Sequence, residues 1–181
     1  MYIDKEFEDH DIYIFRNIIP IDICEKMTYF IEYNDKKTDT DNPTYLKTYH
    51  LTDEKKTREM DTDHIDKYTK EIIQNLDKIP SEMSSPVIYR KVYGETKLHI
   101  DGCGVNAENG LYRTLSLIFS FNNNKGGRFT FPRQHISFHL NQGDVAVFPP
   151  FWTHPHEVSA PEPDTYRYTG ISWMYCNAGR T

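Results

Sequence analysis

A histidine and an aspartate in the middle of this chain have the types and the spacing of two ligands to one metal ion. His99 and Asp101 are separated by a single residue, in the segment Lys97 to Gly102. Side chains two residues apart on a β-strand point to the same face, so these two could bind one ion together. Such a pair often occurs by chance, and alone it favours a surface strand over a metal site.

A third ligand must come from a distant part of the chain, and the segment Pro155 to Val158 offers one. His156 lies there between apolar residues, and His154 competes with it for the same role. We favour His156, because it is followed by Val158 within a predicted strand, whereas His154 lies at the turn after Pro149-Pro150. Two imidazoles and one carboxylate form a facial triad, which leaves open coordination positions and suits non-haem Fe(II).

An arginine that opens the last predicted strand could bind an anion beside this metal site. Arg167 and Thr169 alternate along one face of that strand. A buried guanidinium is costly without an anion, which is here either a ligand carboxylate or a protein Asp or Glu. Tyr89 and Tyr93 precede His99, and either tyrosine could donate its hydroxyl to the same carboxylate or belong to an aromatic core.

A series of short strands must position these side chains. Apolar runs separated by Gly, Pro and Asn predict strands at residues 87–93, 97–100, 113–121, 127–131, 135–140, 144–148, 154–158 and 166–175. Short strands with this punctuation predict a jelly roll of two packed sheets. We therefore expect a mainly β fold with flanking helices.

The first part of the chain predicts a helical support for that jelly roll. Residues 11–19 alternate as a strand, and helices are predicted after Pro20 and over residues 63–78. The apolar faces of the two helices contain Ile23, Met27, Phe30 and Ile31, then Ile65, Tyr68, Ile72 and Leu76. Residues 34–62 predict a polar surface excursion, with a short strand at Tyr45 to Leu51. We expect one domain over residues 1–181, in which 1–86 provide support, 87–175 form the jelly-roll core, and the two helices cover the larger sheet.

Composition and charge exclude several classes of protein. The chain has 181 residues, a formal net charge of −6 and no run of Lys or Arg, which argues against nucleic-acid binding. No apolar stretch has the length of a membrane span, and the charged N-terminus does not resemble a signal peptide. The 3 cysteines lack C-x-x-C spacing, which is typical of free thiols in a reducing compartment. We therefore expect a cytoplasmic protein.

Taken in order, the motifs from residue 87 onward resemble those of the 2-oxoglutarate- and Fe(II)-dependent dioxygenases, specifically the prolyl 4-hydroxylase-like group. The resemblance covers about residues 87–175. Its motifs here are Val92-Tyr93-Gly94, His99-Ile100-Asp101, Arg113 to Asn122, Gly126 to Pro132, Gly143-Asp144, His156-Glu157-Val158 and Arg167 to Trp173.

This resemblance implies a double-stranded β-helix with an iron site and a cosubstrate site. The implied Fe(II) ligands are His99, Asp101 and His156. The implied contacts to the distal carboxylate of 2-oxoglutarate are Arg167, Thr169 and Tyr93. The reaction would use O2, with ascorbate as an allowed reductant, and would couple hydroxylation to the decarboxylation of 2-oxoglutarate to succinate. The implied substrate is a prolyl residue in a peptide or protein.

Two departures from the family pattern keep other functions open. Ser120-Phe121-Asn122 has no tyrosine where relatives often have one, and Arg128 stands where relatives often have an acidic residue. One alternative is therefore a hydroxylase of another side chain or of a free amino acid. Another is a non-catalytic, cupin-like jelly roll that binds a ligand. The acidic balance disfavours a nucleic-acid demethylase of the same fold.

Overall fold

The computed structural model describes residues 2–4, 7–33, 63–76, 83–85, 87–102 and 110–177. The predicted excursion at residues 34–62, with its strand at Tyr45 to Leu51, lies outside these residues, as does Cys103.

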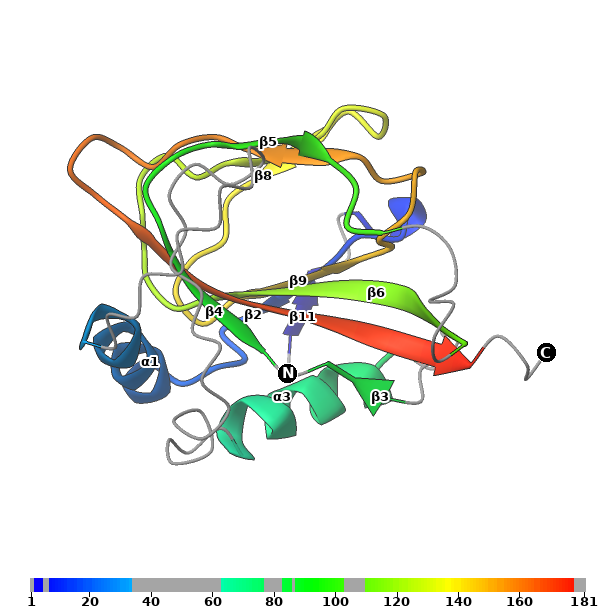
Figure 1. Ribbon diagram of the computed structural model, residues 1–181, viewed down its shortest axis with the longest axis horizontal. Helices are drawn as coiled ribbons and strands as arrows, with labels where there is room; N and C mark the ends of the chain where they lie inside the picture. The colour runs from blue at the N-terminus through cyan, green and yellow to red at the C-terminus, as the bar shows by residue number, and fades with distance from the viewer. Residues whose placement is uncertain are drawn as a thin grey trace.

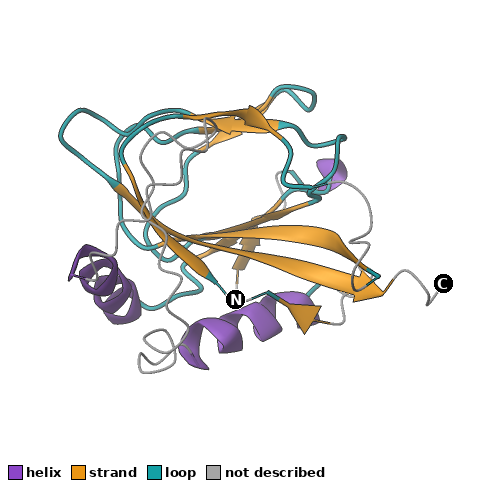
Figure 2. Ribbon diagram, viewed as in Figure 1, coloured by secondary structure: helices purple, strands orange, loops and turns teal. Residues whose placement is uncertain are grey.

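Two antiparallel sheets face each other, as the sequence predicts (Figures 1 and 2). The 7-stranded sheet consists, in order, of β1 (Tyr2–Asp4), β2 (Tyr13–Arg16), β9 (Val145–Phe148), β6 (Leu111–Ser120), β11 (Arg167–Asn177) and β3 (Met83–Ser84), with β4 (Ile88–Val92) also paired to β11. The 4-stranded sheet consists of β5 (Thr96–His99), β10 (His156–Val158), β7 (Phe129–Phe131) and β8 (Ile136–Phe138). The mainly β, jelly-roll fold class is therefore confirmed.

Each strand predicted from residue 87 onward is present, and the differences at the strand ends have local causes. β7 begins at Phe129 rather than at residue 127, because Gly126 and Gly127 have φ angles of 78° and 57°. These left-handed conformations suit glycine and do not continue a strand. β10 begins at His156 rather than at residue 154, because the His154 amide donates to the Phe151 carbonyl in a turn.

The two described α-helices pack on the outer face of the larger sheet (Figure 1), as predicted. They are α1 (Ile21–Tyr33) and α3 (Asp63–Gln74), and a 3-10 helix, η1, covers Glu8–His10. The predicted apolar faces are buried in one cluster with the sheet residues Leu115, Leu117, Phe119, Val145 and Val147. No helix in the described part of the chain is long and apolar enough to cross a membrane.

The larger sheet is buried on both of its faces. On β6, Leu117 and Phe119 point toward the helices, whereas Ile118 points toward the smaller sheet. The cluster between the sheets also contains Phe129, Phe131, Phe148 and Val158. Burial on both faces explains why the β9 sequence Val-Ala-Val-Phe is apolar throughout.

A buried carboxylate joins the turn after β2 to the turn before β9. Asp144 is 1% exposed, and its oxygens accept hydrogen bonds from Arg16 Nη1 at 2.6 Å, the Asn17 amide at 3.0 Å and the Asn141 amide at 2.9 Å. This carboxylate therefore fixes the approach of β2 to β9, which are paired in the larger sheet.

We expect Asp144→Ala to lower the free energy of unfolding by about 3 kcal/mol, because the partly buried Arg16 guanidinium and two backbone amides lose their acceptor. Urea denaturation measures this loss. Glu25→Ala, on the exposed side of α1, is the control and should change stability by less than about 0.5 kcal/mol. Equal stability of the two variants would contradict the role given to Asp144.

Candidate metal centre

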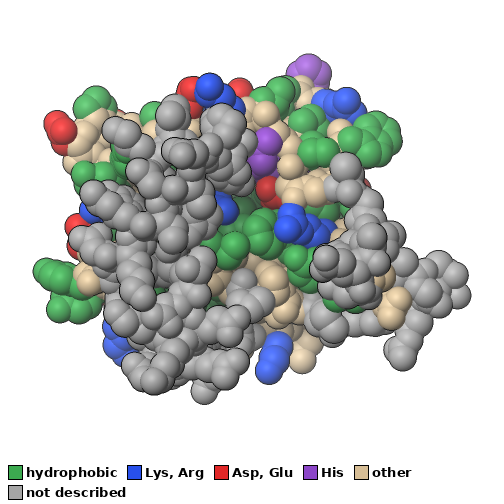
Figure 3. All heavy atoms as spheres, viewed as in Figure 1, with side chains coloured by type: hydrophobic (Ala, Val, Ile, Leu, Met, Phe, Trp, Pro, Cys, Tyr) green, Lys and Arg blue, Asp and Glu red, His purple; other side chains and the backbone are tan. Residues whose placement is uncertain are grey.

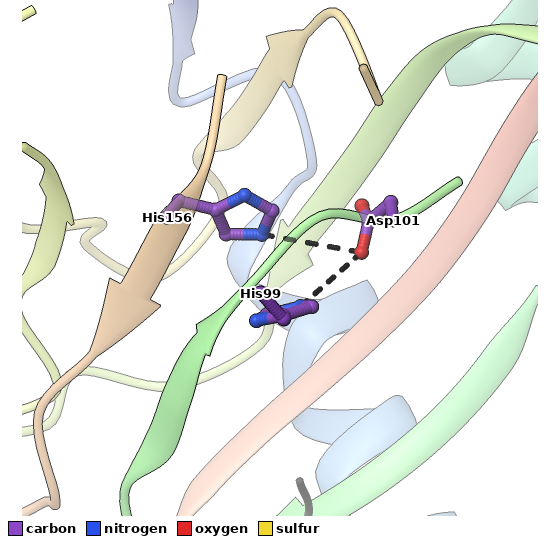
Figure 4. Close-up of side chains that lie close together, drawn as sticks. All are labelled: His99, Asp101 and His156. Atoms are coloured by element: carbon purple, nitrogen blue, oxygen red, sulfur yellow. Dashed lines mark ion pairs between the residues drawn. The ribbon is translucent and has the colours of Figure 1, made fainter. Parts of the chain in front are cut away.

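Three side chains that can bind a metal meet between the two sheets (Figure 4). His99 ends β5, Asp101 follows it, and His156 opens β10 directly opposite His99 in the ladder. Asp101 Oδ1 lies 3.3 Å from His99 Nε2 and 3.9 Å from His156 Nε2. One ligand atom from each residue lies within 4.8 Å of the others, so the group could hold a single ion.

Hydrogen bonds orient both imidazoles toward this shared space. Nδ1 of His99 lies 2.8 Å from the Lys97 carbonyl oxygen, and Nδ1 of His156 lies 3.1 Å from the His154 carbonyl oxygen. Each Nδ1–H donates to its carbonyl, which leaves the Nε2 lone pair for a metal. Asp101 Oδ2 is buried and has no hydrogen-bond partner in the described part of the chain. A metal ion would satisfy this carboxylate, so the three residues fit one.

Burial and neighbouring charges shift the pKa values of the three residues in different directions. Burial is the largest single effect and would raise the pKa of Asp101, but the hydrogen bond with His99, the charge of His156 and the weaker contacts together hold the pKa well below its usual range. Burial lowers the pKa of His156 to about 4. Burial also acts to lower the pKa of His99, but the hydrogen bond and charge of Asp101 raise it. Protons therefore compete with a metal ion more strongly at His99 than at His156.

The structure brings His156, and not His154, into this group. His154 is buried, and both of its ring nitrogens have other neighbours. Its Nδ1 lies 2.8 Å from Thr153 Oγ1, and its Nε2 lies 2.8 Å from the His10 carbonyl oxygen. His154 thus joins the turn before β10 to η1.

The same cavity contains a buried guanidinium. The cavity spans about 420 Å³ including its open mouth. Arg167 and Thr169 line it together with the metal-ligand candidates, as the alternation along β11 predicts. Burial, with the nearby charge of Arg90 as the second cause, lowers the pKa of Arg167 to about 10. Its Nη2 donates to Thr96 Oγ1 at 3.3 Å, and its Nε has no hydrogen-bond partner among the described residues. Basic, acidic and histidine side chains gather around apolar ones near the centre of the face in Figure 3.

Thr96 reaches this cavity through an irregularity in β5. His156 pairs with His99, but Val158 pairs with Thr96, so the register shifts between the two pairs. The extra residue on β5 leaves both Lys97 and Leu98 exposed, and turns Thr96 and His99 to the same side. Strict alternation would have placed Lys97 there, so the sequence pattern did not reveal Thr96.

The tyrosine expected beside Arg167 is not at the cavity. Neither Tyr89 nor Tyr93 lines it, because Arg90 and Val92 occupy the inward face of β4. Tyr89 packs in the outer core, and Tyr93 packs edge to face against Tyr166 with 6.3 Å between ring centroids. The hydroxyl that meets Arg167 in the structure belongs to Thr96, and a contact of Tyr93 with a bound cosubstrate stays a prediction.

Two further arginines have structural contacts that the sequence did not define. Arg113 donates a hydrogen bond to the Asp101 carbonyl, and its Cζ lies 4.0 Å from the centre of the Trp173 ring. Arg113 therefore holds the backbone of Asp101 in place. Arg128 is exposed and donates to Ser137 Oγ and to the Ser137 carbonyl, which ties β7 to β8. Its neighbour Phe129, rather than Arg128, faces the cavity.

Known proteins share this fold. The viral collagen prolyl hydroxylase of Paramecium Bursaria Chlorella virus-1, solved as a 2OG complex, matches 92% of this chain and 96% of its own at 12% identity, with a TM-score of 0.70. The match to a Pseudomonas putida prolyl-4-hydroxylase covers 94% of this chain and 95% of the hydroxylase at 15% sequence identity, with a TM-score of 0.68. A third match is a prolyl hydroxylase from Trichoplax adhaerens, solved in complex with a hypoxia inducible factor peptide fragment. It covers 94% of this chain and 86% of that hydroxylase at 13% sequence identity, also with a TM-score of 0.68.

The family of this chain is identified by a match of its sequence to a family model, and not by the distant structures above. No curated protein sequence matches this chain. Residues 87–175 match the model of the 2OG-Fe(II) oxygenase superfamily, and this range contains each residue of the candidate centre. Over residues 87–175 the chain therefore belongs to the 2OG-Fe(II) oxygenase superfamily, whose members are enzymes that use Fe(II), 2-oxoglutarate and O2.

Proposed function

We propose that this enzyme hydroxylates a prolyl residue in a peptide or protein and couples that reaction to the decarboxylation of 2-oxoglutarate. The observation that carries the proposal is the shared cavity, in which the His99, Asp101 and His156 side chains face the same space as Arg167. A metal-ligand set and a carboxylate-binding group are the two features that this chemistry needs. The similarity in fold to prolyl hydroxylases that act on collagen or bind a peptide supports the choice of substrate.

Each residue of the cavity has a separate role in this proposal. His99 and His156 bind the metal through Nε2, and Asp101 binds it through its carboxylate. Arg167 binds the distal carboxylate of 2-oxoglutarate with the hydroxyl of Thr169, because a guanidinium offers a planar pair of donors to a carboxylate. Arg113 is a positioning residue that acts through the Asp101 backbone.

The overall reaction balances without a further reactant. Bound Fe(II) supplies the electron-transfer chemistry with O2. One oxygen atom enters succinate as CO2 leaves 2-oxoglutarate, and the other enters the C–H bond of the substrate as a hydroxyl group. The protein orients the reactants and limits the access of water with an apolar lining of Val92, Ile118, Phe129, Val158 and Ile171.

Incubation with Fe(II), 2-oxoglutarate and a panel of proline-containing peptides should produce succinate and peptides that are heavier by one oxygen atom on proline. Mass spectrometry locates that oxygen, and matched peptides with alanine in place of proline are the control. Oxygen on another side chain, or succinate formation stimulated only by a free amino acid, would overturn the prolyl assignment. A protein that binds metal and 2-oxoglutarate but never forms succinate would instead be a binding module.

The two buried histidines near the centre provide a matched test of the metal assignment. His156→Ala should weaken Fe(II) binding by at least about 100-fold, because loss of a ligand costs more than loss of a supporting hydrogen bond. His154→Ala should keep the metal affinity of the parent while it lowers the stability, since it removes two partly buried hydrogen bonds. Anaerobic metal titration and thermal melting separate these outcomes, and the reverse pattern would place the metal on His154.

Arg167→Lys should weaken the binding of 2-oxoglutarate by roughly tenfold to a hundredfold, because lysine keeps the charge but loses the planar fork. Metal affinity should stay unchanged, since Arg167 is not a ligand. Anaerobic titration of 2-oxoglutarate into metal-loaded protein measures the effect. Parent-like affinity for 2-oxoglutarate in this variant would refute the assignment of Arg167 to the cosubstrate.

A further inference from the structure

An exposed tryptophan lies on the turn that leads into β10. Trp152 is 64% exposed, and the centre of its ring lies 5.4 Å from Cζ of Arg133, which belongs to the turn between β7 and β8. A guanidinium at this distance is attracted to the face of the ring and restrains its orientation. Tryptophan and arginine are also the two residue types that most often carry the binding energy of protein interfaces.

Hydrogen bonds from two other segments hold the backbone of this turn. The Gln134 side-chain amide donates to the Thr153 carbonyl at 2.8 Å. The amide of Gly102, the residue after Asp101, donates to the Pro150 carbonyl at 3.1 Å. The indole is therefore presented on a fixed turn, so a partner that binds there has few protein groups to order.

The turn lies at the end of the cavity that is open to solvent. His156, a candidate metal ligand, begins β10 four residues after Trp152. The His99 side chain is 15% exposed, whereas Arg167 at the other end of the cavity is buried. A peptide that places a side chain beside the metal ligands therefore crosses the rim to which Trp152 belongs.

The chemistry of this rim favours a ligand with apolar rings and acidic groups. Residues 132–135 and 149–155 contain Arg133 but no Asp or Glu, although the whole chain has a formal net charge of −6. Proline rings pack well on aromatic side chains, and a proline-rich segment is already extended, so it loses little conformational entropy when it binds. An aspartate or glutamate in the same segment would pair with Arg133.

We propose that Trp152 and Arg133 form a docking site, outside the cavity, for a second stretch of the peptide substrate that contains prolines and acidic residues. This inference rests on the proposed function of the cavity. The residue to be hydroxylated enters the cavity, while a proline further along the peptide packs on the Trp152 ring and an acidic side chain pairs with Arg133. The protein would then prefer long peptides over short peptides with the same target proline.

The test uses three peptides that share one short sequence around the target proline. The first peptide is that sequence alone, and the second extends it at both ends with prolines and aspartates. The third has the length of the second, with alanine and asparagine in place of the added prolines and aspartates. Succinate formation and peptide mass give KM and kcat. Indole fluorescence of the protein loaded with Fe(II) and 2-oxoglutarate gives peptide affinity without O2, because Trp152 is the exposed one of the 2 tryptophans and Trp173 is buried.

In the parent protein, the second peptide should have a KM about tenfold or more below those of the other two. Trp152→Ala should remove most of this advantage, and the loss should appear in KM rather than in kcat. Trp152→Phe keeps an aromatic face and should retain most of the advantage. Arg133→Gln should weaken binding of the second peptide by about twofold to fivefold and should reduce the salt dependence of that binding.

Tyr29 provides a matched control for Trp152. It is also 64% exposed, but it lies on α1, which packs on the outer face of the larger sheet, away from the cavity. Tyr29→Ala removes an exposed aromatic ring of the same accessibility and should behave as the parent with all three peptides.

Other outcomes overturn the docking site. Equal KM values for the three peptides in the parent would show that no contact outside the cavity contributes to binding. An equal rise in KM for the short and long peptides in Trp152→Ala would place Trp152 at the target residue instead. A similar loss in Tyr29→Ala would show that the effect does not depend on the rim. A parent protein that leaves all three peptides unmodified would refute the proposed function itself.

Discussion

The pairing of β5 with β10 is the constraint on which the rest of the candidate centre depends. It places His99 directly opposite His156, so two imidazoles from distant parts of the chain meet by backbone register alone. A slip of one residue would turn one imidazole to the outer face of the sheet. The irregularity in β5 adds a second effect, because it turns Thr96 and His99 to the same side. The pairing of β5 with β10 thereby brings the metal-ligand candidates into the same cavity as Arg167.

Much of the fold could be predicted because its signals are local. Alternation and turn residues located the strands from residue 87 onward, and helical spacing located the buried faces of α1 and α3. The His-x-Asp pair and the alternation of Arg167 with Thr169 likewise depend on neighbours in the sequence. The preference for His156 over His154 needed a strand boundary, and the strand does begin at His156.

The rest of the site depends on contacts that sequence spacing does not encode. Tyr89, Arg90 and Lys91 are consecutive, and alternation alone does not say which face of β4 is inward. That choice is made by Tyr89, which packs against Phe30 of α1 and against Phe121, the residue after β6, and so turns Arg90 toward the cavity. The extra residue in β5 also leaves no sequence signal, because the strand Thr96–His99 contains no glycine or proline. For these reasons the sequence did not predict Arg90 and Thr96 as lining residues of the cavity.

The carbonyl groups that orient the two imidazoles have a consequence for how this centre can change during evolution. Both acceptors, on Lys97 and His154, belong to the main chain two residues before the histidine concerned. Every residue type has a carbonyl, so no substitution at either position deletes the acceptor. The hydrogen bond that selects the tautomer of each histidine is therefore kept after substitution of Lys97 or His154, as long as the strands form. Mutation can more readily reshape the side-chain wall of the cavity, so new specificities can arise there while the ligand geometry is inherited intact.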